Sequence, residues 1–175
     1  MTNNEITIPY SKRKLYTSLI LFISTSCLCV WGLSIADRQT SVDPFSIKSF
    51  CVIWIIFSVP ISFYYINRLF IAKRPGFVIN SEGIIDNSSM LGAQSFKWSN
   101  IIRFGTTSAM TASIVLVFVN DPDVVTKNDN YLRPFFRASN TKTYGTPFLI
   151  SSGALDCSFN DLNRLLLEGF EKYKT

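Results

Sequence analysis

At 175 residues the chain has room for one ordinary domain and an extension. Its mean hydropathy of +0.23 and its 14% aromatic content are high for a soluble domain of this size, and they point to membrane segments. The net charge of +5 does not indicate nucleic-acid binding, because residues 1–74 carry 8 basic and 3 acidic residues and residues 75–175 carry 9 of each. The positive excess therefore surrounds the apolar segments.

The N-terminal part predicts a transmembrane hairpin. Residues 1–14 are expected to be a polar tail on the cytoplasmic side. Leu15–Ala36 contains 22 residues without a charge, and Ser49–Asn67 contains 19. Helices of that length span roughly 30 Å, which is the thickness of the hydrocarbon core. The sequence predicts two helices, 15–36 and 49–71, and a hairpin over 15–71. The alternative, two buried core helices, conflicts with such long charge-free runs.

Basic residues flank the outer ends of both predicted helices. Positive residues stay on the cytoplasmic side of a bacterial membrane. We therefore expect a membrane protein with both termini inside and residues 75–175 in the cytoplasm. The residues that set this orientation are Lys12, Arg13, Lys14, Arg68, Lys73 and Arg74. Gly32 and Ala36 have the small-xxx-small spacing of close helix contacts, which favours packing of the hairpin on itself and also allows oligomers through the membrane helices.

The titratable residues do not predict catalysis. The chain has no histidine, which excludes the usual Ser-His-Asp, Cys-His and His-metal arrangements. Cys27, Cys29 and Cys51 lie inside the apolar helices, and Cys157 stands alone in the C-terminal part. Asp121–Asp129 lacks the ligand spacing of a calcium loop and is expected to be a solvated turn. We expect no metal, no cofactor, no small-molecule substrate and no enzymatic activity.

From Gly76 the pattern changes to short β-branched runs separated by turns. These runs predict six or seven strands. Residues 126–146 are the least regular part. A closing helix is expected after Ser158, the predicted N-cap, with Asp161 three residues later as a short version of a capping-box partner. The predicted strands are 77–80, 84–87, 93–98, 101–107, 112–119, 146–152 and 154–158; the apolar stripe of the helix is Phe159, Leu162, Leu166, Phe170 and Tyr173.

This order of strands followed by one amphipathic helix favours a mainly-β or α+β fold. The sheet would be a bent antiparallel sheet or a partial barrel, capped by the C-terminal helix. The pieces "GFVINSEGIIDNSS", "FKWSNI" and "TYGTPFLISSGALDCSFNDLNRLLLEGFEKY" resemble a family of small bacterial inner-membrane proteins. Members of that family carry two transmembrane helices followed by a pleckstrin-homology-like (PH-like) domain. The resemblance covers most of residues 75–175, matches least around 121–140, and implies no enzymatic activity.

The best binding candidate is the segment "YLRPFFRASNTKTYG", which is basic and aromatic and has no acidic residue. It could place arginines on lipid phosphates and rings at the membrane interface, or it could bind a protein partner. In a purely structural alternative, its phenylalanines fill the core while its basic residues face water. The candidate residues are Tyr131, Arg133, Phe135, Phe136, Arg137, Lys142 and Tyr144. Trp98, in contrast, is expected in the core.

Three functions follow from these observations. The first is a non-catalytic protein that neutralises a membrane-acting bacterial toxin, an immunity-type role that the family resemblance implies. The second is a sensor or scaffold that reads anionic lipids or the envelope through Arg133, Arg137 and Lys142. The third is an enzyme with an atypical site around Cys157 or Asp121–Asp129. The expected partners are membrane lipids and a protein, for which a toxin is the candidate under the first function.

Overall fold

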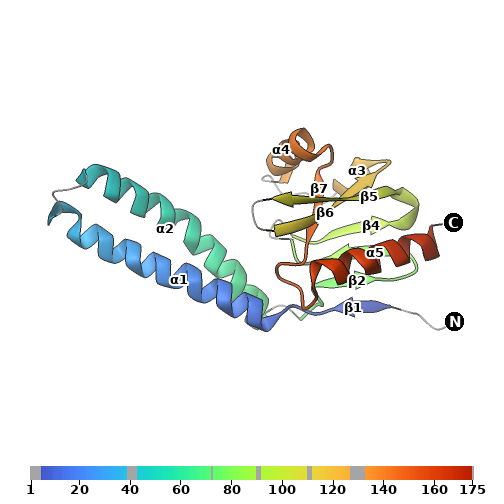
Figure 1. Ribbon diagram of the computed structural model, residues 1–175, viewed down its shortest axis with the longest axis horizontal. Coiled ribbons are helices and arrows are strands. Elements are labelled where there is room, and N and C mark those ends of the chain that lie inside the picture. The colour runs from blue at the N-terminus through green and yellow to red at the C-terminus, as the bar shows by residue number, and fades with distance from the viewer. Residues whose placement is uncertain are drawn as a thin grey trace. The chain divides into compact units, whose positions relative to one another are not determined.

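The computed structural model describes residues 5–38, 43–71, 73–89, 92–109, 112–126 and 133–174. The chain forms two compact units (Figure 1). We call Lys12–Lys73 the hairpin, and we call Met1–Ser11 together with Arg74–Thr175 the module.

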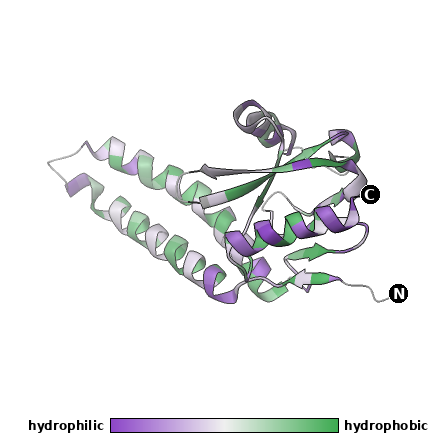
Figure 2. Cartoon of the chain, turned by 45° about the vertical axis from the view of Figure 1, so that its right-hand side comes forward, coloured by the Kyte–Doolittle hydropathy of each residue, from purple (hydrophilic) through white to green (hydrophobic). Residues whose placement is uncertain are grey.

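The hairpin consists of two long antiparallel helices in contact with each other. Helix α1 runs over Lys12–Ile35 and continues as a 3-10 turn, η1, at Ala36–Arg38. Helix α2 runs over Pro44–Ile66 and continues as a π-helical turn, η2, at Asn67–Ile71. Both are long and apolar enough to cross a membrane, and Figure 2 shows apolar residues along their length.

Both helices begin earlier than predicted, and a local cap marks the start of α2. Asp43 is the N-cap of α2: its carboxylate accepts a hydrogen bond from the Ser46 backbone N–H at 2.9 Å. Pro44 occupies the first helical position, where a missing N–H costs nothing. The start was predicted at residue 49 because the charge-free run begins after Lys48. The helix itself continues through Lys48.

Contacts between the two helices are polar as well as apolar. The hydroxyls of Ser26 and Ser58 lie 2.8 Å apart. Phe22 stacks between Trp54 and Tyr65, with ring centroids at 6.2 and 5.9 Å. A hydrogen bond between helices satisfies hydroxyls that would find no water in an apolar environment. These pairs hold α1 and α2 together along the hairpin.

The module begins with a strand that sequence analysis missed. Strand β1, Ile6–Ile8, lies within the predicted polar tail and pairs antiparallel with β2, Phe77–Ile79. Strand β2 pairs with β3, Gly83–Asp86, and β3 with β4, Gln94–Lys97, so that the order is β1-β2-β3-β4. A strand of three residues has no readable alternation, and its partner lies about 70 positions away in the chain.

A second sheet has the order β5-β6-β7. Strands β5, Ile101–Ala109, and β6, Ala112–Val119, form an antiparallel pair, and β7, Phe148–Ser151, adds to β6. The turn η3, Trp98–Asn100, leads from the first sheet into the second. Among the described residues the two sheets are separate and do not close into a barrel.

The predicted strand at 154–158 is wrong. Only Leu155 forms a β-bridge there, to Tyr10. The backbone N–H of Asp156 donates to the Pro9 carbonyl at 2.9 Å, and the N–H of Ser11 donates to the Ala154 carbonyl at 3.0 Å. The backbone of this segment therefore forms hydrogen bonds with the N-terminal residues, in a turn that precedes the last helix.

Three helices complete the module. Helix α3 covers Pro122–Thr126, and α4 covers Arg133–Tyr144, inside the stretch predicted to be least regular. Helix α5, Phe159–Tyr173, follows Ser158 as predicted and lies beside β2 (Figure 1). Its buried Leu162 and Leu166 join the core. The rest of that core comes from both sheets and includes Phe77, Ile79, Ile84, Phe96, Trp98, Val115, Val117, Phe148 and Ile150.

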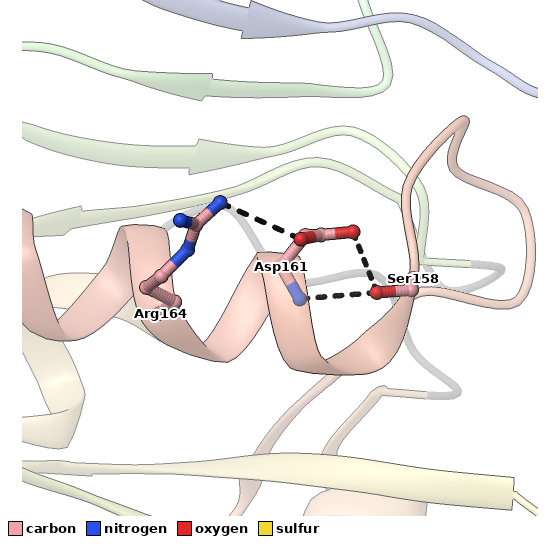
Figure 3. Close-up of polar contacts among 3 residues, drawn as sticks. All are labelled: Ser158, Asp161 and Arg164. Atoms are coloured by element: carbon pink, nitrogen blue, oxygen red, sulfur yellow. Dashed lines mark hydrogen bonds and ion pairs between the residues drawn. The ribbon is translucent and has the colours of Figure 1, made fainter.

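The cap of α5 differs in detail from a capping box (Figure 3). The Ser158 Oγ accepts from the Asp161 backbone N–H at 3.1 Å and donates to the Asp161 carboxylate at 2.6 Å. The hydrogen bond from the Ser158 hydroxyl, followed by the backbone N–H of Ser158 and a smaller contribution from Arg164, holds the pKa of the Asp161 carboxyl below its ordinary value of 3.8. The stability that this carboxylate contributes is therefore present above pH 3.8 and is lost as the pH falls through the lowered value.

Candidate functional site

The aromatic and basic residues of α4 are buried in the reverse of the way expected if its phenylalanines filled the core. Phe135 and Phe136 are exposed, at 74% and 44%, whereas Arg133 and Arg137 are buried, at 7% and 9%. Positions four apart lie on one face of a helix, which explains why the two arginines are buried together. The proposed filling of the core by the phenylalanines is therefore wrong. Tyr131 lies outside the described residues.

Arg137 is held against the core of the module. Its guanidinium carbon lies 4.6 Å from the centroid of the Phe148 ring, and Phe148 is fully buried in β7. A guanidinium over an aromatic face is attracted by the negative charge of that face. The contact orients the planar guanidinium group over the ring.

Arg133 reaches the loop before β4. Its Nη2 donates to the Ala93 carbonyl at 3.4 Å. Gly92 adopts a φ of +106°, and a Cβ at this position would collide with the Arg133 guanidinium. A glycine therefore suits this position twice, once for its backbone conformation and once for the space that the arginine takes.

The two arginines border a small polar pocket of about 110 Å³. The other polar side chains in its wall are Ser89 and Gln94, from the segment between β3 and β4, and Asn140, from α4 itself. Among the described residues, none that line this pocket is acidic. Two guanidinium groups beside hydroxyl and amide groups form an arrangement that suits an anion.

A second cleft, which is apolar and has a volume of about 370 Å³, also borders Arg137. It runs between α4 and the sheet that contains β5 and β6. Ala138 and Thr141 line it from α4, and Ile102, Phe118 and Val119 line it from the strands. Arg137 and Pro147 border both this cleft and the polar pocket.

The remaining predicted binding residues lie apart from the two pockets. Lys142 is exposed on α4, and Tyr144 is half-buried at its C-terminal end. The predicted orientation residues fall at the ends of the hairpin and at the start of the module. Lys12, Arg13, Lys73 and Arg74 are exposed there, Lys14 is half-buried, and the guanidinium carbon of Arg68 lies 5.2 Å from the Tyr64 ring centroid.

The candidates for chemistry form no constellation in the part of the chain that the structure describes. No three His, Cys, Asp or Glu residues come together there. Cys157 is half-buried against the core. The Asp121 carboxylate accepts from the Asp123 backbone N–H at 2.9 Å, as in an ordinary turn that starts a helix, and Asp129 lies outside the described residues.

Sequence reasoning missed Ser89, Gln94 and Asn140. No local pattern marks Ser89 and Gln94, which lie between the end of β3 and the start of β4 and meet α4 only through packing, whereas Asn140 follows Arg133 and Arg137 on α4 itself. The available signal was the i,i+4 spacing of Arg133 and Arg137, which places both on one face of any helix.

Searches against family models, curated proteins and solved structures found no match to this chain.

Proposed function

We propose that the chain is a non-catalytic protein of the bacterial inner membrane that displays a PH-like binding module on the cytoplasmic side. Its recognition element is α4, and its ligands are anionic lipids. The observation that carries this proposal is the arrangement on α4: two exposed phenylalanines beside two arginines that border a polar pocket.

Strand β1 supports a hairpin anchor. It precedes α1 in the chain, yet Ile8 pairs with Phe77, which follows α2. A hydrogen-bonded sheet cannot have a bilayer between its strands, because every backbone group in the bilayer core must be satisfied locally. Both ends of the hairpin therefore belong on one side of any membrane that it spans.

The basic flanking residues favour the cytoplasm as that side. A fluorescent protein fused to Thr175 is expected to fluoresce, since it folds in the cytoplasm, and an alkaline phosphatase fused there is expected to be inactive. An active phosphatase would contradict this orientation.

Helix α4 favours lipid recognition over the other candidate functions. Phe135 and Phe136 contact each other edge to face, with centroids 5.7 Å apart, and expose a local apolar surface. Aromatic rings insert at the boundary between headgroups and acyl chains, and basic residues attract the anionic headgroups. The two exposed rings and the exposed Lys142 on one helix supply both attractions, and the guanidiniums of Arg133 and Arg137 border a polar pocket on the same helix.

Replacing Phe135 and Phe136 by serine is expected to weaken binding to anionic membranes severalfold. The full-length protein in phosphatidylcholine nanodiscs would be mixed with separate phosphatidylglycerol vesicles, and co-flotation would be measured at several salt concentrations. Binding of the wild type should fall as salt rises, because salt screens exposed charges. The control is Leu167→Ser, which removes an apolar residue of similar exposure, 43%, from α5. Absence of binding at low salt, or equal loss in the control, would refute lipid recognition by α4.

A second candidate is the immunity-type role, and one feature of the hairpin favours it. An apolar groove of about 510 Å³ runs along one face of α1 and α2, bordered by Ile23, Val30, Val59 and Phe63. Ser26, Cys27 and Ser62 add small residues to its wall. In a bilayer such a groove can accept a helix of a membrane-acting toxin. Cells without the gene should then become sensitive to a toxin encoded nearby, and unchanged sensitivity would end this proposal.

A further inference from the structure

We propose that the polar pocket and the apolar cleft beside Arg137 form one site for a single-chain lipid with a phosphate headgroup. This inference rests on the proposed function and deepens it, from adsorption onto a membrane to the capture of one lipid molecule. The two cavities share Arg137 and Pro147 in their walls, so that a charged and an apolar compartment adjoin.

The polar pocket suits the headgroup. Arg133 and Arg137 enter it from consecutive turns of α4, and guanidinium groups bind phosphate oxygens in a bidentate manner. Ser89, Gln94 and Asn140 supply hydroxyl and amide hydrogen-bonding groups to the same pocket. Because no acidic residue lines it among the described residues, the wall is electrostatically complementary to an anion.

The apolar cleft suits one acyl chain. Its volume of about 370 Å³ lies near the lower end of the roughly 300–1,000 Å³ range of ligand pockets. Ile102, Phe118, Val119 and Ala138 give it an apolar lining. A lipid with one chain also leaves a bilayer readily, since a single acyl chain gives only marginal membrane binding.

The wall that the two cavities share is firmly attached to the sheet. Thr146 is buried and donates its hydroxyl hydrogen to the Val117 carbonyl of β6 at 2.5 Å. Gly145 ends α4 with a φ of +75°, and its N–H donates to the Thr141 carbonyl at 2.9 Å. The segment from α4 to Pro147 is therefore positioned before any ligand arrives, which lowers the entropic cost of binding.

The test uses the full-length protein in phosphatidylcholine nanodiscs and a lysophosphatidic acid that carries a diazirine in its chain. After irradiation, mass spectrometry gives the number of lipids attached to each protein and the peptides that carry them. We expect labelling that saturates near one lipid per protein, on peptides of β5, β6 and α4. Unlabelled lysophosphatidic acid should compete, whereas lysophosphatidylcholine, which has no net charge, should not.

Two substitutions probe the two compartments separately. Arg137→Gln should weaken the lipid affinity about tenfold or more, because it removes a charge-assisted pair of hydrogen bonds. Ala138→Trp should abolish labelling by filling the apolar cleft, and it alters an exposed position, so that the module still folds. Arg164→Gln is the control: it removes the same charge from an exposed position on α5, and labelling should not change.

The inference is overturned if labelling does not saturate, if it falls only on the hairpin, or if lysophosphatidylcholine or a fatty acid competes equally well. Wild-type labelling of both Arg137→Gln and Ala138→Trp would overturn it as well. Failure of the proposed function looks different. If vesicle co-flotation persists and depends on Phe135 and Phe136 while saturable labelling is absent, α4 binds membranes without capturing a single lipid.

Discussion

Replacing Trp98 by alanine is expected to lower the free energy of unfolding of the module by about 3–5 kcal/mol. Trp98 is only 2% exposed, and its indole N–H donates to the Asn80 carbonyl at 2.8 Å. Its ring stacks on Tyr173, with centroids 6.0 Å apart. The substitution leaves a large cavity between the turn η3 and α5, and it also leaves the Asn80 carbonyl without this donor.

Gly169 shows how closely α5 approaches that ring. A Cβ at this position would lie 2.9 Å from the Trp98 Cη2, closer than real side chains pack. Trp98 and Gly169 therefore form a matched contact, and the cavity left by alanine cannot collapse simply by moving α5.

The measurement is urea-dependent pulse proteolysis of the full-length protein in mild detergent, which reports the fraction of folded module. Trp31→Ala is the matched control, because it removes the same side chain from an exposed position, 62%, in the hairpin. The control should leave the midpoint of the module unchanged. Equal midpoints for Trp98→Ala and the wild type would show that Trp98 is not a core residue.

Replacing Ile8 by alanine is expected to destabilise the module by about 2–5 kcal/mol, although Ile8 lies before the first membrane helix. Ile8 is 5% exposed and belongs to the core of the module. The neighbouring residues support its position, since the Tyr10 hydroxyl donates to the Asn87 carbonyl at 2.7 Å. Loss of the side chain removes apolar contacts and loosens the edge strand of the first sheet.

Ile6→Ala is the matched control for this prediction. It changes the same residue type in the same strand, at a position that is 41% exposed, and should alter the stability by no more than about 0.5 kcal/mol. The same pulse-proteolysis measurement applies. If Ile8→Ala were as silent as Ile6→Ala, β1 would not contribute to the module, and the argument that both ends of the hairpin lie on one side would lose its support.

The composition of α4 indicated which residue types it contains, but it did not indicate which of them are buried. The segment around Arg133 and Phe135 was identified as basic, aromatic and free of acidic residues, and all of this is visible in the sequence. Which residues face inward depends on what the helix meets. Arg137 is buried because it lies against the ring of Phe148, a residue of the last strand. Without the sheet, aromatic rings are the natural choice for the buried face, and here that choice was wrong.

The positions of the long helices and the start of α5 could be predicted from the sequence, because they depend on residues close together in the chain. Long charge-free runs predicted α1 and α2, apolar spacing predicted α5, and Ser158 with Asp161 predicted where α5 begins. The tertiary structure alone decided the pairing of β1, the turn around Leu155 and the assembly of the pocket beside Arg137. The difference lies in how far apart in the chain the interacting residues are. Helix formation and capping act within a few residues, whereas an edge strand or a pocket wall owes its place to hydrogen bonds and packing between segments far apart in the chain.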